Sequence, residues 1–204
     1  MVTARLLQHG FFIRLRLLPL FLLTVVLASG HFGGGETAAF AGAPPLSHAA
    51  FILNAARFTT WPAEVFADPA SPLIFCIYKD RQTGRALHEH IQGETIQGRP
   101  LKQVDIDSFL QLTQCHVIYL PSEKMSEYPF AAGNFYGLLT ISDCREFAES
   151  GGMLGFVRGD REVQVIVNPE VLTSFGLSIG PALLQVAEPV HTRKKGPENR
   201  ESDR

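Results

Sequence analysis

The stretch that decides the fold covers residues 138–168, LLTISDCREFAESGGMLGFVRGDREVQVIVN. Its first residues, LLTI, are apolar and β-branched, which predicts a buried strand. A short helix is expected over CREFAES, because Ser142 or Asp143 can cap its first turn and two glycines follow it. MLGFVR and EVQVIVN then predict a β-hairpin that turns at Gly159-Asp160.

The chain that follows the hairpin is expected to be helical. Asn168 can cap a helix, and Pro169 has the backbone angle that suits the first helical turn. Gly176 is expected to end this helix. A last amphipathic helix is expected over residues 177–188, interrupted at its Gly-Pro pair.

Upstream of this stretch, apolar strands alternate with helices. Ser47 can cap a helix whose residues Phe51, Ala55 and Phe58 share one apolar face, and Trp61-Pro62 is expected to end it. Strands are expected at 73–78, 101–106 and 115–120, and helical segments at 83–91, 108–114 and from Ser122. This alternation predicts one α/β domain with a mostly parallel sheet, helices on both faces and a C-terminal β-hairpin.

The two ends of the chain differ from its middle. Three arginines precede the apolar run 17–28 and small residues follow it, so residues 1–41 are expected to be a secretory signal peptide and linker. An uncleaved anchor is the alternative, although a membrane span needs about 20 apolar residues. Residues 42–190 are expected to form the domain, and the polar stretch 191–204 a disordered tail.

Charge and composition exclude several classes of protein. The chain has 204 residues, of which 46% are hydrophobic, which is enough for one sizeable core. Residues 42–190 contain 10 basic and 16 acidic residues, a net charge of −6. Nucleic acid is therefore not an expected partner, because binding it requires a basic face.

No catalytic or metal site is predicted from the residues. His88 and His90 lie two apart on a predicted helix, so their rings project in nearly opposite directions and cannot share one metal ion. Cys115 and His116 are neighbours on a predicted strand and point to opposite faces. The sequence contains no GxSxG, HExxH or CxxC motif.

Four stretches resemble a known family. They are similar, in the same order along the chain, to stretches of the YfiR-like family of small bacterial periplasmic proteins. The stretches are FILNAARFTTWP, GRALHEHIQGETIQGRPLKQVDI, CHVIYLPSEK, and TISDCREFAESGGMLGFV with VIVNPEVLTSFGLSIGPALLQVAE. The resemblance covers residues 49–188. It implies an exported domain without enzymatic activity or cofactor, which binds the periplasmic domain of an inner-membrane diguanylate cyclase, holds it inactive, and so lowers cyclic di-GMP and biofilm formation.

The resemblance also implies a homodimer and a disulfide. The three cysteines allow three pairings by themselves, and the positions that match the family's bridged pair are Cys76 and Cys115. Cys144 departs from the family, because Gly151 and Gly152 stand where its disulfide partner would be expected.

Two alternatives remain open. One is a small-molecule receptor that uses the cleft at the carboxyl ends of the parallel strands, and the other is a thiol enzyme that uses Cys144. For the binding protein, the expected partner contacts are the polar residues Asn54 and Arg57 on the first helix, and Glu146 and Glu149 beside the hairpin.

Overall fold

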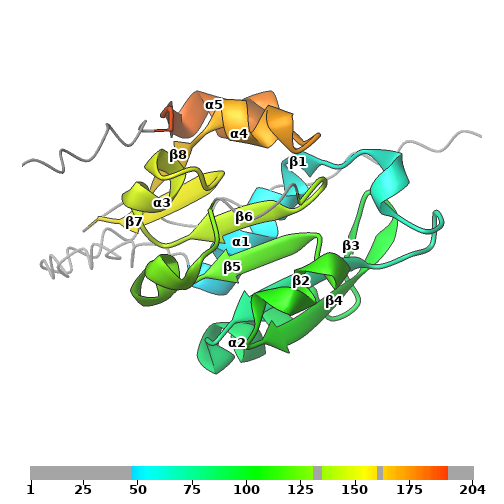
Figure 1. Ribbon diagram of the computed structural model, residues 1–204. Coiled ribbons are helices and arrows are strands. Elements are labelled where there is room, and N and C mark those ends of the chain that lie inside the picture. The colour runs from blue at the N-terminus through cyan, green and yellow to red at the C-terminus, as the bar shows by residue number, and fades with distance from the viewer. Residues whose placement is uncertain (1–46, 131–134, 160–162, 193–204) are drawn as a thin grey trace, which may run out of the picture. The chain divides into compact units, whose positions relative to one another are not determined.

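An eight-stranded sheet forms the centre of the domain. The computed structural model describes residues 47–130, 135–159 and 163–192, all within one compact unit. The strand order is β10-β8-β7-β6-β5-β2-β4-β3 (Figure 1). The strands are β2 Leu73–Tyr78, β3 Thr95–Ile96, β4 Arg99–Ile106, β5 Val117–Leu120, β6 Leu139–Ser142, β7 Leu154–Arg158, β8 Val163–Val167 and β10 Ala187–Pro189. All neighbours are parallel except β3–β4 and β7–β8, which confirms the predicted α/β class and the hairpin.

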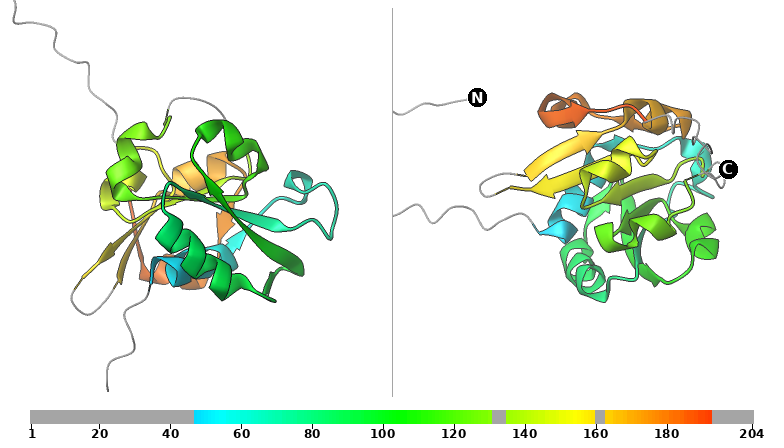
Figure 2. Two further views of the ribbon diagram at one scale, coloured as in Figure 1. Left: turned by 90° about the horizontal axis from the view of Figure 1, so that it is seen from below. Right: turned by 60° about the vertical axis from the view of Figure 1, so that its left-hand side comes forward.

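Helices cover both faces of this sheet. The first face is covered by α1 His48–Arg57, α2 Arg81–Ile91, α4 Pro169–Ser174 and α5 Pro181–Val186. The second face carries α3 Arg145–Glu149 and the 3₁₀ segments η2 Phe109–Gln114 and η3 Ser122–Glu127. Between α1 and β2 the chain forms an arm, residues 58–72, which contains β1 Thr59–Thr60 and η1 Ala63–Val65. Its strand β1 pairs with β9 Ser178–Ile179. Figure 2 shows α4 and α5 together along one side of the domain.

The buried strands supply both layers of the core. Successive residues of a strand point to opposite faces, and on β5 the side chains of Val117 and Tyr119 join one apolar cluster while Ile118 and Leu120 join the other. All four side chains are fully buried. This explains the unbroken apolar runs in the sequence, which are typical of a parallel sheet covered on both sides.

The first helix begins where it was predicted but ends earlier. Ser47 Oγ accepts a hydrogen bond from the Ala50 amide at 3.1 Å, which confirms the predicted cap. The helix ends at Arg57 rather than at the Trp-Pro pair, and the chain turns into β1. Phe58 is 43% exposed instead of lying on the buried face.

The predicted cap of α3 is wrong. Asp143 Oδ1 accepts from the Ser122 amide at 2.6 Å, so it fastens the start of η3 rather than its own helix. Ser142 is buried as the last residue of β6. Cys144 occupies the cap position and makes no capping hydrogen bond.

The C-terminal part of the chain also differs from the prediction. Residues 177–188 form β9, α5 and the start of β10. The predicted break at Gly180-Pro181 is present, since α5 begins at Pro181, but the residues before it are a strand and not a helix. The Gly180 amide donates to Phe58 O at 2.7 Å and ties this stretch to the arm. In the hairpin, Arg158 pairs with Val163, so four residues separate the strands. The predicted turn residue Asp160 lies outside the described residues.

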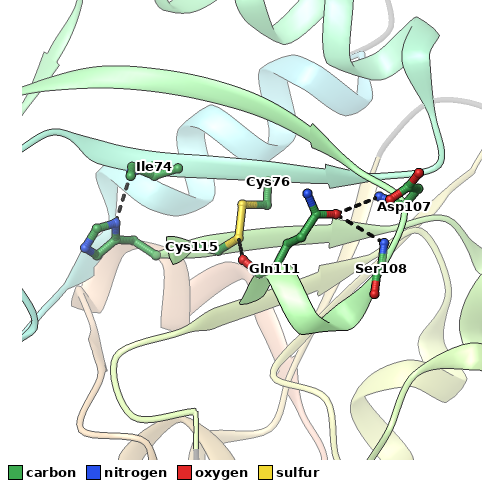
Figure 3. The surroundings of a disulfide bond; sticks show 7 residues. Ile74, Cys76, Asp107, Ser108, Gln111 and Cys115 are labelled. Atoms are coloured by element: carbon green, nitrogen blue, oxygen red, sulfur yellow. Dashed lines mark hydrogen bonds between the residues drawn. A yellow bond between two sulfur atoms is a disulfide. The ribbon is translucent and has the colours of Figure 1, made fainter. Parts of the chain in front are cut away.

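A disulfide cross-links the central strands. Cys76 on β2 and Cys115, just before β5, are joined with a Cα–Cα distance of 5.8 Å, the pair that the resemblance implied (Figure 3). Cys76 is fully buried and Cys115 nearly so. The carbonyl oxygen of Gln111 lies 3.4 Å from the Cys115 sulfur. This is a packing contact, since a disulfide sulfur carries no hydrogen to donate.

His116 fastens the arm to the same strands. Its Nδ1 accepts from the Ile74 amide at 3.1 Å, and its ring stacks on Phe66 of the arm with centroids 4.6 Å apart. Burial lowers the pKa of His116, against an opposing hydrogen bond with the Val65 carbonyl. The neutral ring is therefore the form that the fold requires, because only neutral Nδ1 has a lone pair for Ile74.

We expect Cys76→Ser to lower the melting temperature clearly. The bridge closes a loop with a sequence separation of 39 residues, which in the chain-entropy model corresponds to about 4 kcal/mol, or on the order of 10 °C for a domain of this size. Differential scanning calorimetry of the oxidised protein measures the change. Cys144→Ser is the matched control and should shift the melting temperature little; an equal loss in both variants would contradict a special role for the bridge.

We also expect stability to fall as the pH drops below the ordinary pKa of histidine, near 6.5. Because the folded-state pKa of His116 is lowered, its stabilising contribution is present above pH 6.5 and is lost as the pH falls towards the folded-state pKa. Denaturant unfolding between pH 7.5 and pH 5 measures the slope. His116→Asn retains an acceptor for Ile74 but does not titrate, so an unchanged slope in this variant would disprove the assignment.

Candidate functional site

One hollow lies at the amino ends of β2 and β5. Its volume is about 540 Å³, and its lining includes Glu64, Phe66, Thr113, Cys115, His116 and Tyr136. Tyr136 donates to Glu64 at 3.1 Å across this region. His116 is held neutral and its Nδ1 is occupied, so the ring is not placed to act as a general base. The hollow is therefore a surface cavity lined by one carboxylate, Glu64, and it does not bring a nucleophile together with a general base.

Two further hollows lie at the carboxyl ends of the strands. They have volumes of about 650 Å³ and 330 Å³, and Asp80 lines both. The topological switch point lies between β2 and β5, because the chain leaves β2 towards β4 on one side and β5 towards β6 on the other. Asp80 follows β2, but the lining of neither hollow includes a residue of β5. Asp80 is committed to capping α2, because Oδ1 accepts from the Gln82 and Thr83 amides at 3.1 and 3.0 Å.

A pair of rings, the half-buried His48 and the buried Tyr119, lies at the smaller of these hollows, which His48 helps to line. The Tyr119 hydroxyl is 3.0 Å from His48 Nδ1, and Tyr119 is fully buried. Burial, assisted by the nearby carboxylates of Asp143 and Asp80, raises the pKa of Tyr119, so the phenol keeps its proton. Sequence reasoning missed this pair because the two residues are 71 positions apart.

Cys144 has neighbours that do not activate a thiol. It is half-buried, with Ser142 Oγ at 3.7 Å and Met125 Sδ at 3.6 Å from its sulfur. Burial raises the pKa of Cys144, so the unreactive thiol form predominates at neutral pH. A nucleophilic cysteine requires the opposite shift, usually produced by a cation.

The four predicted contact residues do not form one surface. Asn54 and Arg57 lie on α1, over the first face of the sheet, whereas Glu146 and Glu149 lie on α3, over the second. Arg57 is exposed and forms an ion pair with Glu94 at 2.7 Å.

The two glutamates of α3 differ from each other in exposure. Glu146 is exposed. The Glu149 side chain is only 13% exposed and lies 3.9 Å from Arg145, so little of it is available to a partner. The role of the four residues in binding stays a prediction.

The described ranges hold neither a metal cluster nor a membrane span. No three His, Cys, Asp or Glu side chains among the described residues are grouped to hold an ion. Likewise, no helix in the described part of the chain is long and apolar enough to cross a membrane.

Comparison with known proteins identifies the family. The family model described as YfiR/HmsC-like matches residues 47–188, from the cap of α1 to β10. No curated protein matches the chain. The match covers well over half of the sequence and nearly all of the described domain. The chain therefore belongs to the YfiR/HmsC-like family.

Proposed function

We propose that this protein is an exported periplasmic repressor of an inner-membrane diguanylate cyclase, which it binds through the periplasmic domain of the cyclase. Repression would lower cyclic di-GMP and biofilm formation. The observation that carries the proposal is the family match over residues 47–188, because this family is a regulatory, periplasmic one in diguanylate cyclase signalling. Export by a signal peptide within residues 1–41, which lie outside the described residues, belongs to the proposal, as does a homodimer.

The chemistry of the described side chains supports a binding role. His116 accepts a hydrogen bond from the Ile74 amide and stacks on Phe66 of the arm, so its ring has a structural role. The free cysteine, Cys144, has a raised pKa. The polar side chains described above cap helices or hold neighbouring segments together. Such contacts keep a binding surface in one shape.

A small-molecule receptor is the second candidate. The two hollows that share Asp80 favour it, because open α/β sheets bind ligands outside the carboxyl ends of their strands. A ligand there would fit the first proposal as well, if it bound the free and partner-bound forms unequally.

Deletion of the gene should raise the cyclic di-GMP level of its native host cells. Charge reversal on the face of the sheet that carries α3 should also raise it. We expect Glu146→Arg to relieve repression, because Glu146 is exposed on α3 and like-charge contacts weaken an interface by about tenfold or more. Glu89→Arg on α2, over the opposite face of the sheet, is the matched control, since Glu89 is also an exposed helical glutamate and is not among the predicted contact residues. The measurements are cyclic di-GMP by mass spectrometry and co-purification from detergent-solubilised membranes.

Full repression by both variants, with a membrane diguanylate cyclase still co-purifying, would place the contact elsewhere on the domain. Co-purification without any diguanylate cyclase, together with unchanged cyclic di-GMP after deletion, would refute the proposed function.

The thiol-enzyme alternative predicts a reactive Cys144, and we expect the reverse. Because burial raises the pKa of Cys144, its reaction with Ellman's reagent at pH 7 should be slower than that of free glutathione and should accelerate towards alkaline pH. Cys144→Ser identifies the signal. Rapid labelling at pH 7, combined with a turnover that this variant loses, would favour the enzyme.

A further inference from the structure

One border of the central sheet is unpaired along most of its length. The sheet ends with β4 and β3, and β3 pairs with Arg99 and Pro100 at the start of β4 (Figure 1). On its inner side, β4 pairs with β2 from Leu101 to Ile106. Within the described part of the chain, no strand pairs with the outer side of this stretch. Residues 101–106, which we call the open border, therefore form an edge strand.

The backbone groups of three residues on the open border point out of the sheet. The amide of Lys79, which follows β2, donates to the Ile106 carbonyl at 3.0 Å, so Ile106 directs its peptide groups towards β2. Neighbouring residues of a strand direct their N–H and C=O groups to alternate sides. Leu101, Gln103 and Asp105 therefore direct theirs outward. The described residues supply no hydrogen-bond partner for these outward backbone groups.

Side chains do not fold over these groups. Asp105 and Gln103 lie against α2 instead, and Gln103 Nε2 donates to Asp105 Oδ1 at 2.6 Å. A Cβ on Gly84 of α2 would collide with both of these atoms. Glycine is unfavourable within a helix, but here it gives the two side chains room on the face of the sheet. The backbone of the open border is left accessible as a result.

The opposite border of the sheet is protected, unlike the open border. Its strand β10 has three residues, and Pro189 provides no N–H for a further strand. Natural sheets commonly protect their borders with short strands and prolines. The open border is longer and contains no proline. It carries one exposed lysine, Lys102, which discourages indiscriminate pairing. The open border is therefore suited to a partner strand of matching chemistry.

The side chains beside the outward groups define the segment that fits. On the α2 side, Asp105 is exposed. On the other side, Val104 is half-buried against the apolar cluster of the second face. An added strand would place a side chain next to each of them. Residues 42–190 contain 10 basic and 16 acidic residues, a net charge of −6, which favours a basic partner. The fitting segment is extended, has N–H groups at the paired positions, and alternates basic with apolar residues.

We propose that the open border binds an extended, basic segment of a protein partner, which adds to the sheet as a further strand through the backbone groups of Leu101, Gln103 and Asp105. In binding of this kind, main-chain hydrogen bonds give affinity and alternate side chains give specificity. The inference deepens the proposed function by naming the kind of segment that a partner presents, and rests on that function for the partner's identity. It uses other elements of the fold than the contact expected at Glu146.

Amide hydrogen exchange, measured by NMR on the mature chain, tests the open border directly. In the free protein, the amides of Gln103 and Asp105 should exchange quickly and that of Val104 slowly, because Val104 faces β2. A short synthetic peptide of alternating lysine and valine, at about 1 mM, should slow exchange at Gln103 and Asp105 by about tenfold. A peptide in which proline replaces each valine keeps the charge and should give no protection.

Gln103→Pro and Gln103→Ala are a matched pair of variants. Proline removes the outward N–H, is tolerated where that group faces solvent, and should weaken binding of the lysine-valine peptide about tenfold, the effect of one lost hydrogen bond. Alanine removes the side chain but keeps the N–H, so this variant should bind like the unmodified protein. Chemical-shift titration measures both affinities.

Three results would each overturn the inference. They are slow exchange at Gln103 and Asp105 in the free protein, no slowing by the lysine-valine peptide or equal slowing by the proline peptide, and equal affinity of the two Gln103 variants. These measurements need no cyclase. Their failure is therefore distinguishable from failure of the proposed repression, which is read from cyclic di-GMP.

Discussion

The pairing of β2 with β5 is the contact on which the rest of the structure depends. These strands lie at the point where the chain changes direction across the sheet, and the disulfide joins them. The residue after Cys115 extends the same contact: the His116 carbonyl accepts from Leu139 of β6 at 2.9 Å and from the Trp61 indole at 3.3 Å. Cys115 and His116, two consecutive residues just before β5, thus contact β2, β6 and the arm. The disulfide and the neutral histidine ring both act at this one point.

The opposite end of the sheet is assembled around Asn168. Its side chain caps α4 through Val171, donates to the carbonyl of Ala148 at the end of α3, and donates to Thr192, which follows β10. One fully buried amide therefore connects two helices and the last described residues of the chain. Such a residue is costly to replace, because each partner would become an unsatisfied buried group. The centre of the domain is thus held by apolar packing and a disulfide, and this edge by polar contacts.

Regulation by such a domain depends on its surfaces. Because the two layers of helices lie on opposite faces of one sheet, Arg57 and Glu146 cannot contact the same partner patch. The edge of the sheet at β10 is a third surface, where β10 pairs with β8 and Glu188 contacts Arg145 of α3. The fold therefore offers separate surfaces on different elements.

Local sequence determined much of this protein: the apolar runs that become buried strands, the caps Ser47 and Asn168, and the hairpin after the glycines, because each depends on residues within a few positions. The resemblance indicated the bridge between Cys76 and Cys115. Tertiary structure alone decided that Asp143 serves η3, that His48 meets Tyr119, and that residues 187–189 form a strand. These outcomes depend on partners distant in the chain. An acceptor oxygen or a short polar stretch is compatible with several local structures, and the choice among them is made only when the sheet brings its partners together.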